Sequence, residues 1–426
     1  MLTDLDLASS IQSQASQCVK CGLCLPYCPT YTLTQNENES PRGRIALMQN
    51  IATEALSLSL KAHSHIDNCL SCKECERVCP AQVSYEQLLL DYRAWEKPKL
   101  SALHSKISFS AHFFEYIAAH PKILRSLAVL LWGIQTLGIQ TLSKKVGLIK
   151  RLGLTRLNAL LPKALAFPKA ILPFYPAIGP QQGTVALFTG CLSTLFDAKT
   201  HQDAITVLQH LGYAIYIPQS QTCCGAIARH SGNVKQATSL LEQNLKAFSA
   251  QNLISNNITH IITTASGCAS MLLHSKIANI IDISDFICQI TWPETILSTL
   301  SLKQAQFSHE KIAVHTPCTL RNSLKKPLVS QNMLEKLGLS CQPLPSLKQG
   351  PEQCCGSAGT YMLSHLTTSE QLLDKALINL EKMAPTRLVT SNIGCALHFQ
   401  KRFTQQNKPI RVCHPISLFA EMLAKD

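Results

Sequence analysis

Short runs of β-branched and aliphatic residues recur through the second half of the chain, and each is followed by apolar residues at helical spacing. The runs lie at 185–191, 211–218 and 258–268, and again at 312–318, 337–345 and 386–395. Strands that alternate with helical stretches of roughly 10–15 residues are typical of parallel βαβ units. The pattern therefore predicts two copies of one α/β unit, at 183–290 and 311–426, which we expect to face each other.

A different pattern precedes these copies. Residues 126–143 include no charged side chain, and Arg125 and the Lys144-Lys145 pair flank them. Such a stretch is at the lower limit for a membrane-spanning helix, which is about 18 residues. Two glutamines, two threonines and two glycines weaken that interpretation. We favour an amphipathic helix in the membrane interface; a helix buried against the α/β units and a spanning helix are the alternatives.

The charge of the chain is concentrated in the same region. The net charge is +13, and residues 99–180 contain eleven Lys or Arg residues but a single acidic residue, Glu115. This segment is predicted to be a basic, apolar helical linker that attracts anionic lipid. Because no RNP motif, zinc finger or recognition helix accompanies the charge, no nucleic-acid partner is expected.

Length and cysteine usage limit the class of protein. A chain of 426 residues predicts two or three domains. The N-terminal residues include acidic side chains and no basic stretch before an apolar run, so no secretory signal is predicted. We therefore expect a cytoplasmic protein with reduced thiols, in which clustered cysteines are metal ligands. The odd total of 19 cysteines also argues against a secreted disulfide protein.

Eight of these cysteines lie within residues 1–98, in two runs with the same spacing, C-x2-C-x2-C-x3-C-P: Cys18, Cys21, Cys24 and Cys28, then Cys69, Cys72, Cys75 and Cys79. This spacing is typical of two-cluster ferredoxins, in which the fourth cysteine of each run binds the other [4Fe–4S] cluster. One cluster is thus assigned to Cys18, Cys21, Cys24 and Cys79, and the other to Cys69, Cys72, Cys75 and Cys28. Zinc, the alternative, does not require the third cysteine or the C-P ending. We expect an α-helical, ferredoxin-like domain with two clusters.

Each α/β copy has its own set of four cysteines, Cys191, Cys223, Cys224 and Cys268 in the first and Cys318, Cys354, Cys355 and Cys395 in the second. Each set contains two adjacent cysteines followed by glycine, which lets the backbone approach a bound group closely. Four soft ligands fit iron–sulfur chemistry, and buried thiols that pack as small apolar groups are the alternative. Cys288, Cys341 and Cys413 fall outside both sets and are interpreted as buried thiols.

These motifs together resemble the iron–sulfur subunit of bacterial glycolate oxidase, and more distantly the cysteine-rich subunits of anaerobic glycerol-3-phosphate dehydrogenase and heterodisulfide reductase. The segments that carry the resemblance are CVKCGLCLPYCPTY, SPRGRI (40–45), IDNCLSCKECE, TASGC (264–268), HTPCTLRN (315–322), CCGSAGTYML (354–363) and SNIGC (391–395). The resemblance implies an electron-transfer subunit, which the basic apolar linker would place on the inner face of the membrane. It would act beside FAD-containing subunits that oxidise glycolate to glyoxylate, and would pass electrons towards a quinone without binding glycolate or supplying a catalytic residue.

One departure from the wider cysteine-rich family concerns the end of each copy. The family ends in C-x-x-C, whereas Met271 follows Cys268 and His398 follows Cys395 at that spacing. Four cysteines in each copy leave open an ordinary [4Fe–4S] cluster, a shared site or a docking surface for the electron acceptor. Met271 is expected in the core, and His398 is either a core residue or a ligand.

The remaining motifs narrow the chemistry. No glycine-rich loop of the G-x-G-x-x-G or Walker type is present, so this chain is not expected to bind its own FAD, NAD or ATP. Arg42 and Arg44 lie between the cysteine runs, where arginines raise a cluster's potential or bind a partner, and His315 is placed to hydrogen-bond a cluster sulfur. Two alternative functions stay open: the same role in a glycerol-3-phosphate or lactate dehydrogenase, and a heterodisulfide-reductase-like catalytic subunit.

Overall fold

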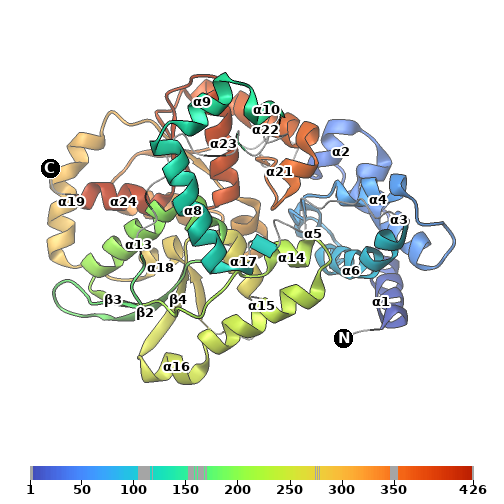
Figure 1. Ribbon diagram of the computed structural model, residues 1–426, viewed down its shortest axis with the longest axis horizontal. Helices are drawn as coiled ribbons and strands as arrows, with labels where there is room; N and C mark the ends of the chain where they lie inside the picture. The colour runs from blue at the N-terminus through green and yellow to red at the C-terminus, as the bar shows by residue number, and fades with distance from the viewer. Residues whose placement is uncertain are drawn as a thin grey trace. The chain divides into compact units, whose positions relative to one another are not determined.

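The structure is a computed structural model (Figure 1). It describes residues 3–103, 116, 117, 119–151, 158, 161, 167, 170–273, 275, 277, 279–345 and 354–424. The chain forms two compact units, the first comprising Met1–Phe113, Ala226–Thr238 and Pro345–Asn379, and the second Phe114–Gly225, Ser239–Leu344 and Leu380–Asp426. The first unit therefore combines the N-terminal cysteine runs with one segment taken from each α/β copy.

The N-terminal part of the first unit is built from helices. They are α1 (Asp4–Ser16), α2 (Pro29–Thr34), the 3-10 helix η1 (Glu37–Glu39), α3 (Pro41–Ala52), α4 (Leu60–Asp67), α5 (Glu74–Arg77) and α6 (Tyr85–Leu103). Helix α1 begins with a capping box between Thr3 and Asp6. Helices α1, α3 and α6 pack around a core that includes Ile11, Met48 and Leu88. This core holds the loops that carry the two cysteine runs.

The two later segments of the first unit contain α14 (Ala226–His230) and α21 (Tyr361–Ser364), together with parts of α15 (Val234–Ala247) and α22 (Leu366–Met383). The first segment reaches α6, where Arg93 Nη1 donates to the carbonyl of His230 over 3.0 Å. A side chain at Gly232 would place its Cβ 2.3 Å from the Arg93 carbonyl oxygen, so only glycine permits this approach.

The second unit contains two sheets. The first has the order β1-β3-β2-β4-β5, formed by β1 (Phe174–Tyr175), β2 (Gly183–Phe188), β3 (Tyr213–Tyr216), β4 (Ile258–Thr263) and β5 (Ile280–Asp282). The second has the order β7-β6-β8-β9, formed by β6 (Ile312–His315), β7 (Cys341–Pro343), β8 (Arg387–Thr390) and β9 (Arg411–Cys413). Strand β1 pairs antiparallel with β3, and the other described pairs are parallel, as the alternating pattern predicts.

Helices join and cover these strands. After the strands of the first copy come α12 (Leu192–Phe196), α13 (Ala198–His210), α16 (Ala250–Ser255), α17 (Ser266–Leu273), α18 (Ile283–Gln289) and α19 (Glu294–Phe307). The second copy has the π-helix η2 (Thr319–Ser323), α20 (Val329–Lys336), α23 (Ile393–Gln405) and α24 (Pro415–Leu423). Helices α13 and α24 pack together, as do α18 and α20, so a helix of one copy packs on a helix of the other (Figure 1). One apolar core runs through both copies and includes Val185, Ile262, Val314 and Val389.

The basic apolar linker forms α8 (Pro121–Thr136), α9 (Ile139–Lys145) and α10 (Leu148–Arg151) in this same unit (Figure 1). Leu124 and Ala128 are buried on α8, which packs on α12. Within the described residues, no single helix has the length and apolarity needed to cross a membrane; Ile123–Thr136 and Ile139–Lys145 meet those criteria only as a pair bent by 67°.

Candidate metal centres

The two N-terminal cysteine runs adopt the same local backbone. Lys20 and Gly22 have positive φ in the first run, and Ser71 and Lys73 have positive φ at the matching positions of the second. Left-handed residues turn a loop back on itself, which lets three thiols of one short loop face the same point. At Gly22 the turn lies against Arg42, whose Nη1 donates to the carbonyl of Lys20 over 3.0 Å.

The four cysteines assigned to one cluster line a single open cavity. They are Cys18, Cys21 and Cys24 from the first run and Cys79 from the second, and Cys75 also reaches its wall. Burial raises the pKa of Cys24 to about 11. A thiol of that pKa stays protonated at neutral pH unless a positive charge is supplied, as a metal ion does. The donor set therefore fits the cluster that the spacing predicts.

The second set centres on Cys28, Cys69 and Cys75. Burial raises the pKa of Cys75, and the nearby charges of Cys69 and Cys28 raise it further, so the three thiols lie within electrostatic range of one another. The Tyr85 hydroxyl donates to Cys69 Sγ over 3.6 Å. Cys72, the fourth member, packs against a separate small group of buried side chains that includes Leu70.

A buried cation lies beside this second set. The Arg44 side chain is 1% exposed and pairs with Glu39 over 2.6 Å. Its Nη1 is 3.9 Å from Cys28 Sγ, and its Nε donates to the carbonyl of His65 over 2.7 Å. Burial alone would lower the pKa of Arg44, but the acidic groups around it, led by Cys69, raise the pKa above its ordinary value. A guanidinium held in this way offsets negative charge on sulfur.

The first α/β copy gathers its four cysteines in one unit. Cys191 precedes α12 directly, and its Sγ is 3.3 Å from that of Cys223. Hydrogen bonds from Cys191 and Cys224 raise the pKa of Cys223, and the thiol of Cys224 raises that of Cys268. The thiols thus form a chain of contacts from Cys191 to Cys268, a soft donor set that fits an iron–sulfur group.

Two buried amides hold this loop in place, and neither was singled out from the sequence. Asn244 Oδ1 accepts from the amide of Thr222 and its Nδ2 donates to the carbonyl of Cys223, both over 2.9 Å. Gln221 accepts from the amide of Thr189 over 2.9 Å and donates to the carbonyl of Leu187. The one available signal was a polar residue on the buried face of an amphipathic helix, at Asn244 in α15.

The second copy repeats the local geometry of the adjacent cysteines. The amide of Gly356 donates to Cys354 Sγ over 3.4 Å, as the amide of Gly225 donates to Cys223 Sγ over the same distance. Gly356 has a positive φ of 74°, and a Cβ there would lie 2.3 Å from the Ser369 carbonyl oxygen. Cys355 is buried. Each Cys-Cys-Gly motif therefore needs its glycine for a left-handed turn.

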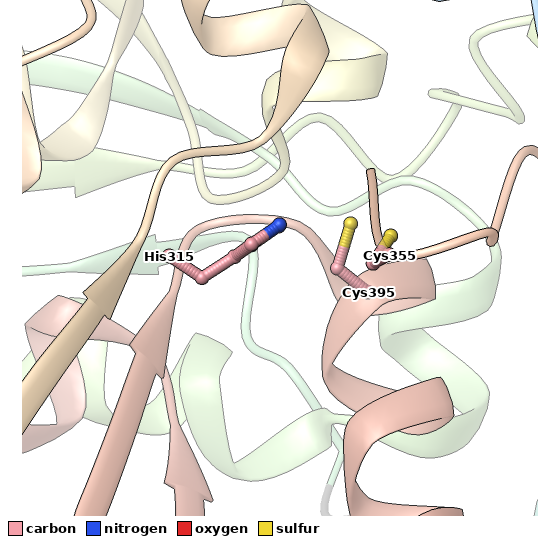
Figure 2. Close-up of side chains that lie close together, drawn as sticks. All are labelled: His315, Cys355 and Cys395. Atoms are coloured by element: carbon pink, nitrogen blue, oxygen red, sulfur yellow. The ribbon is translucent and has the colours of Figure 1, made fainter. Parts of the chain in front are cut away.

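At the ends of β6 and α23, His315 and Cys395 point towards each other (Figure 2). Both are buried, and their ligand atoms lie within 4.8 Å of one another. The His315 Nδ1 pairs with Thr390 Oγ1 over 3.0 Å, which orients the imidazole. His315, placed near sulfur from the sequence, is thus set to bind or hydrogen-bond a group at Cys395. Cys318 follows β6 and is half-buried.

Hydrogen bonds join the cysteine-bearing ends of the two copies inside the second unit. Ser266 Oγ and Thr319 Oγ1 are 2.7 Å apart, and the amide of Ser266 donates to the carbonyl of Ser391 over 3.2 Å. Asn392 Nδ2 contacts both hydroxyls. These bonds confirm that the carboxyl ends of the two sheets face each other, where ligands of parallel sheets bind.

The three other cysteines, predicted to be buried, are only partly buried, whereas both departures from the family pattern lie in the interior. Cys288, Cys341 and Cys413 are half-buried and pack against the core of the second unit. Met271 is buried on α17, and His398 is fully buried on α23.

Comparison with known proteins agrees with this geometry. Residues 14–83 match the 4Fe-4S dicluster domain, and residues 185–273 and 312–400 match the cysteine-rich domain. The probable glycolate oxidase iron–sulfur subunit of Bacillus subtilis is 29% identical over 96% of this chain and 94% of its own. The glycolate oxidase iron–sulfur subunit of Escherichia coli is 28% identical over 89% of this chain and 88% of its own. Lactate utilization protein A of Geobacillus kaustophilus is 28% identical over 54% of this chain and 95% of its own.

The domains and the cysteine sites define an iron–sulfur protein with a two-cluster 4Fe-4S domain and two cysteine-rich domains. The resemblance to the glycolate oxidase iron–sulfur subunit is confirmed over most of the chain, and together with the 4Fe-4S dicluster domain it identifies an electron-transfer iron–sulfur subunit.

Proposed function

We propose that this chain is the iron–sulfur subunit of a glycolate dehydrogenase complex, in which it takes electrons from FAD-containing subunits and passes them towards a quinone. The observation that carries the proposal is the similarity to glycolate oxidase iron–sulfur subunits over 96% and 89% of the chain. The chain itself binds no glycolate in this proposal, and the partner subunits select the substrate.

The described residues support a carrier of single electrons. A [4Fe–4S] cluster accepts and donates one electron, whereas a flavin delivers two. Cys18, Cys21, Cys24 and Cys79 would hold one cluster, and Cys69, Cys72, Cys75 and Cys28 the other. The buried Arg44 would offset the negative charge that an added electron brings to the second site. Burial of Cys28 keeps water away from it.

The cysteine-rich copies would receive the electrons. We propose that Cys191, Cys223, Cys224 and Cys268 hold a further iron–sulfur group, because their thiols form a continuous set in the structure. The repeat relation extends the same proposal to Cys318, Cys354, Cys355 and Cys395.

The linker helices would place the complex on the inner face of the membrane. Leu130, Leu137, Leu142 and Val146 are 58%, 76%, 61% and 63% exposed on α8, α9 and the turns that join them. Exposed lysines and arginines at 125, 144, 145, 150 and 151 lie in the same three helices. Apolar side chains beside basic ones favour binding to an anionic lipid surface, where a quinone is also found.

A lactate dehydrogenase complex is the second candidate. The alignments with lactate utilization protein A sequences span 54–57% of this chain and nearly the whole length of each relative. Since glycolate and lactate are both 2-hydroxyacids, the same electron-transfer chain serves either reaction.

The experiment is anaerobic purification of the tagged chain with its bound flavoprotein, followed by addition of glycolate or lactate and EPR of the iron–sulfur signals. Glycolate is expected to reduce the clusters. Reduction by lactate alone would establish the second candidate, and reduction by neither substrate would overturn the proposal. Dithionite reduction of the same sample is the control for intact clusters.

A further inference from the structure

The first compact unit brings the second cysteine-rich copy to the second ferredoxin-type run. Cys72, from that run, and Cys354, from the Cys-Cys-Gly motif, pack against the same small buried core. Leu70, Tyr361 and Leu372 form this core. Apolar packing therefore connects one cysteine to the other.

Polar contacts fasten the same two segments together. The Tyr361 hydroxyl donates to Asn68 Oδ1 over 2.5 Å. His365 Nε2 lies 2.8 Å from Asp67 Oδ2, and Lys375 Nζ donates to the carbonyl of Thr32 over 3.0 Å. Residues 361–375 are therefore held at three points on the residues that lie around Cys69 and follow Cys28.

Further hydrogen bonds connect Asn68 to Cys28, a predicted ligand of the second cluster. Asn68 Nδ2 donates to Glu39 Oε2 over 2.7 Å, and the same carboxylate oxygen accepts from Arg44 over 2.6 Å. Arg44 in turn lies 3.9 Å from Cys28 Sγ. One hydrogen-bonded path thus runs from a predicted cluster ligand to Tyr361, six residues after Cys355.

The first cysteine-rich copy also reaches this run, because Arg93 donates to the carbonyl of Cys69 over 3.3 Å as well as to the carbonyl of His230. Its segment 226–238 joins the first unit at α6, through Arg93 and His230. Its adjacent cysteines, Cys223 and Cys224, belong to the second unit instead. Among the described residues, the asymmetry is therefore that Cys354 of the second copy packs on the same core as Cys72, and neither adjacent cysteine of the first copy does.

We propose that the contact between residues 67–72 and 354–375 is the electron exit of the ferredoxin-type domain, and that it leads to the second cysteine-rich copy. The inference rests on the proposed function. One electron leaves the site of Cys28, Cys69, Cys72 and Cys75 and is gained by the iron–sulfur group at Cys354-Cys355, with no bond made or broken. Cys18, Cys21, Cys24 and Cys79 then form the entry site, and Tyr361 and Asn68 are positioning residues.

The internal repeat supplies the first test. Full-length protein is loaded with iron and sulfide anaerobically and reduced with dithionite, and EPR relaxation is measured for the signal that Cys69→Ser removes. Cys355→Ser is expected to change this relaxation, because it removes a nearby paramagnetic neighbour, and the matched Cys224→Ser to leave it unchanged. An effect of Cys224→Ser alone, or a second copy without iron in elemental analysis, would overturn the proposal.

A milder pair of variants guards against misfolding. Tyr361→Phe removes only the hydroxyl that binds Asn68, while Tyr92→Phe removes a hydroxyl that binds Glu96 in the same unit. A light pulse on an added photosensitiser with a sacrificial electron donor reduces the protein, and freeze-quench EPR then follows electron arrival at the second copy. We expect Tyr361→Phe alone to slow electron arrival by about two- to tenfold, because this factor corresponds to the free energy of about one hydrogen bond. Equal rates in both variants would contradict the proposal. Because neither experiment uses glycolate or the flavoprotein, failure here is distinct from failure of the proposed function.

Discussion

Two arginines of one short motif have different surroundings. Arg44 is buried beside Cys28, whereas the Arg42 side chain is 31% exposed, pairs with Glu37 and lines the cavity of the first cysteine set. Solvent screens an exposed charge far more than a buried one. The buried arginine is therefore the one that can tune a cluster strongly.

We expect Arg44→Gln, which removes the buried positive charge and leaves Glu39 with His65 and Asn68 as partners, to lower the reduction potential of the cluster at Cys28. A loss on the order of 30–60 mV corresponds to about 0.7–1.4 kcal/mol for one electron. EPR-monitored redox titration measures it. The control is Arg42→Gln, which removes the exposed positive charge, and an equal or larger shift there would contradict the argument.

A buried histidine links the stability of the second unit to pH. Burial lowers the pKa of His201 to about 4, below its ordinary 6.5. The unfolded chain therefore binds a proton below pH 6.5 that the folded protein refuses until about pH 4, so this contribution to stability is present above pH 6.5 and is lost as the pH falls. Burial also lowers the pKa of the neighbouring His414, to about 3, which acts in the same direction.

When the pH falls from 7 to 5, we expect the free energy of unfolding to decrease less in His201→Gln than in the unsubstituted protein. The difference should be about 1–2 kcal/mol. Urea unfolding followed by circular dichroism at each pH measures the difference. The half-buried His210→Gln on the same helix is the control, and identical pH profiles for both variants would argue against the assignment. Asp282 acts in the opposite sense, because burial raises its pKa to about 7, and it is present in all three proteins.

At the scale of single elements, the packing of segment 226–238 on α6 depends on a close approach between the two backbones. We expect Gly232→Ala to destabilise the protein by about 1–3 kcal/mol, because φ is +75° and the new Cβ would lie 2.3 Å from the Arg93 carbonyl oxygen. Gly133→Ala, with no atom within 4 Å of its added Cβ, should be neutral. Comparable losses in thermal unfolding of both variants would show that the approach to Arg93 is not responsible.

The linker helices make a second prediction at this scale. If α8 and α9 bind lipid, Leu142→Gln should weaken binding to vesicles with phosphatidylserine by about tenfold, since an apolar side chain is withheld from the membrane. Leu302→Gln, on α19, is a matched control because Leu302 is 81% exposed. Cosedimentation measures both, and an equal effect of the two substitutions would contradict a membrane surface at α8 and α9.

At the scale of the whole molecule, the iron content per chain shows how many iron–sulfur clusters the protein binds. Filling of the ferredoxin-type sites alone requires about eight iron atoms per chain, and filling of the cysteine-rich copies requires about twelve or more. We expect the larger value, with an extra EPR signal that Cys224→Ser or Cys355→Ser removes. Iron and acid-labile sulfide assays measure the ratio. Eight iron atoms would assign the cysteine-rich copies a docking or structural role, and zinc in place of iron would contradict the assignment altogether.

The amino-acid pattern alone was sufficient to predict the two α/β copies, and the cysteine spacing was sufficient to predict the 4Fe-4S dicluster domain. Local rules explain this success. Strand and helix periodicity, a cysteine after a strand and a glycine after two cysteines are decided within a few residues. The amides of Gln221 and Asn244 could not be found in the same way, because their partners lie 21 to 34 residues away in the chain.

Cysteine identity and spacing thus determined which chemistry this protein can hold, since soft ligands at short separations bind iron–sulfur groups wherever the chain carries them. Only the tertiary structure decided which of these sites are neighbours. It placed Cys72 with Cys354, buried Arg44 beside Cys28 and set His315 against Cys395 (Figure 2). Packing of segments far apart in sequence determines such pairs, and electron transfer and cluster tuning depend on distance and burial, which no local pattern encodes.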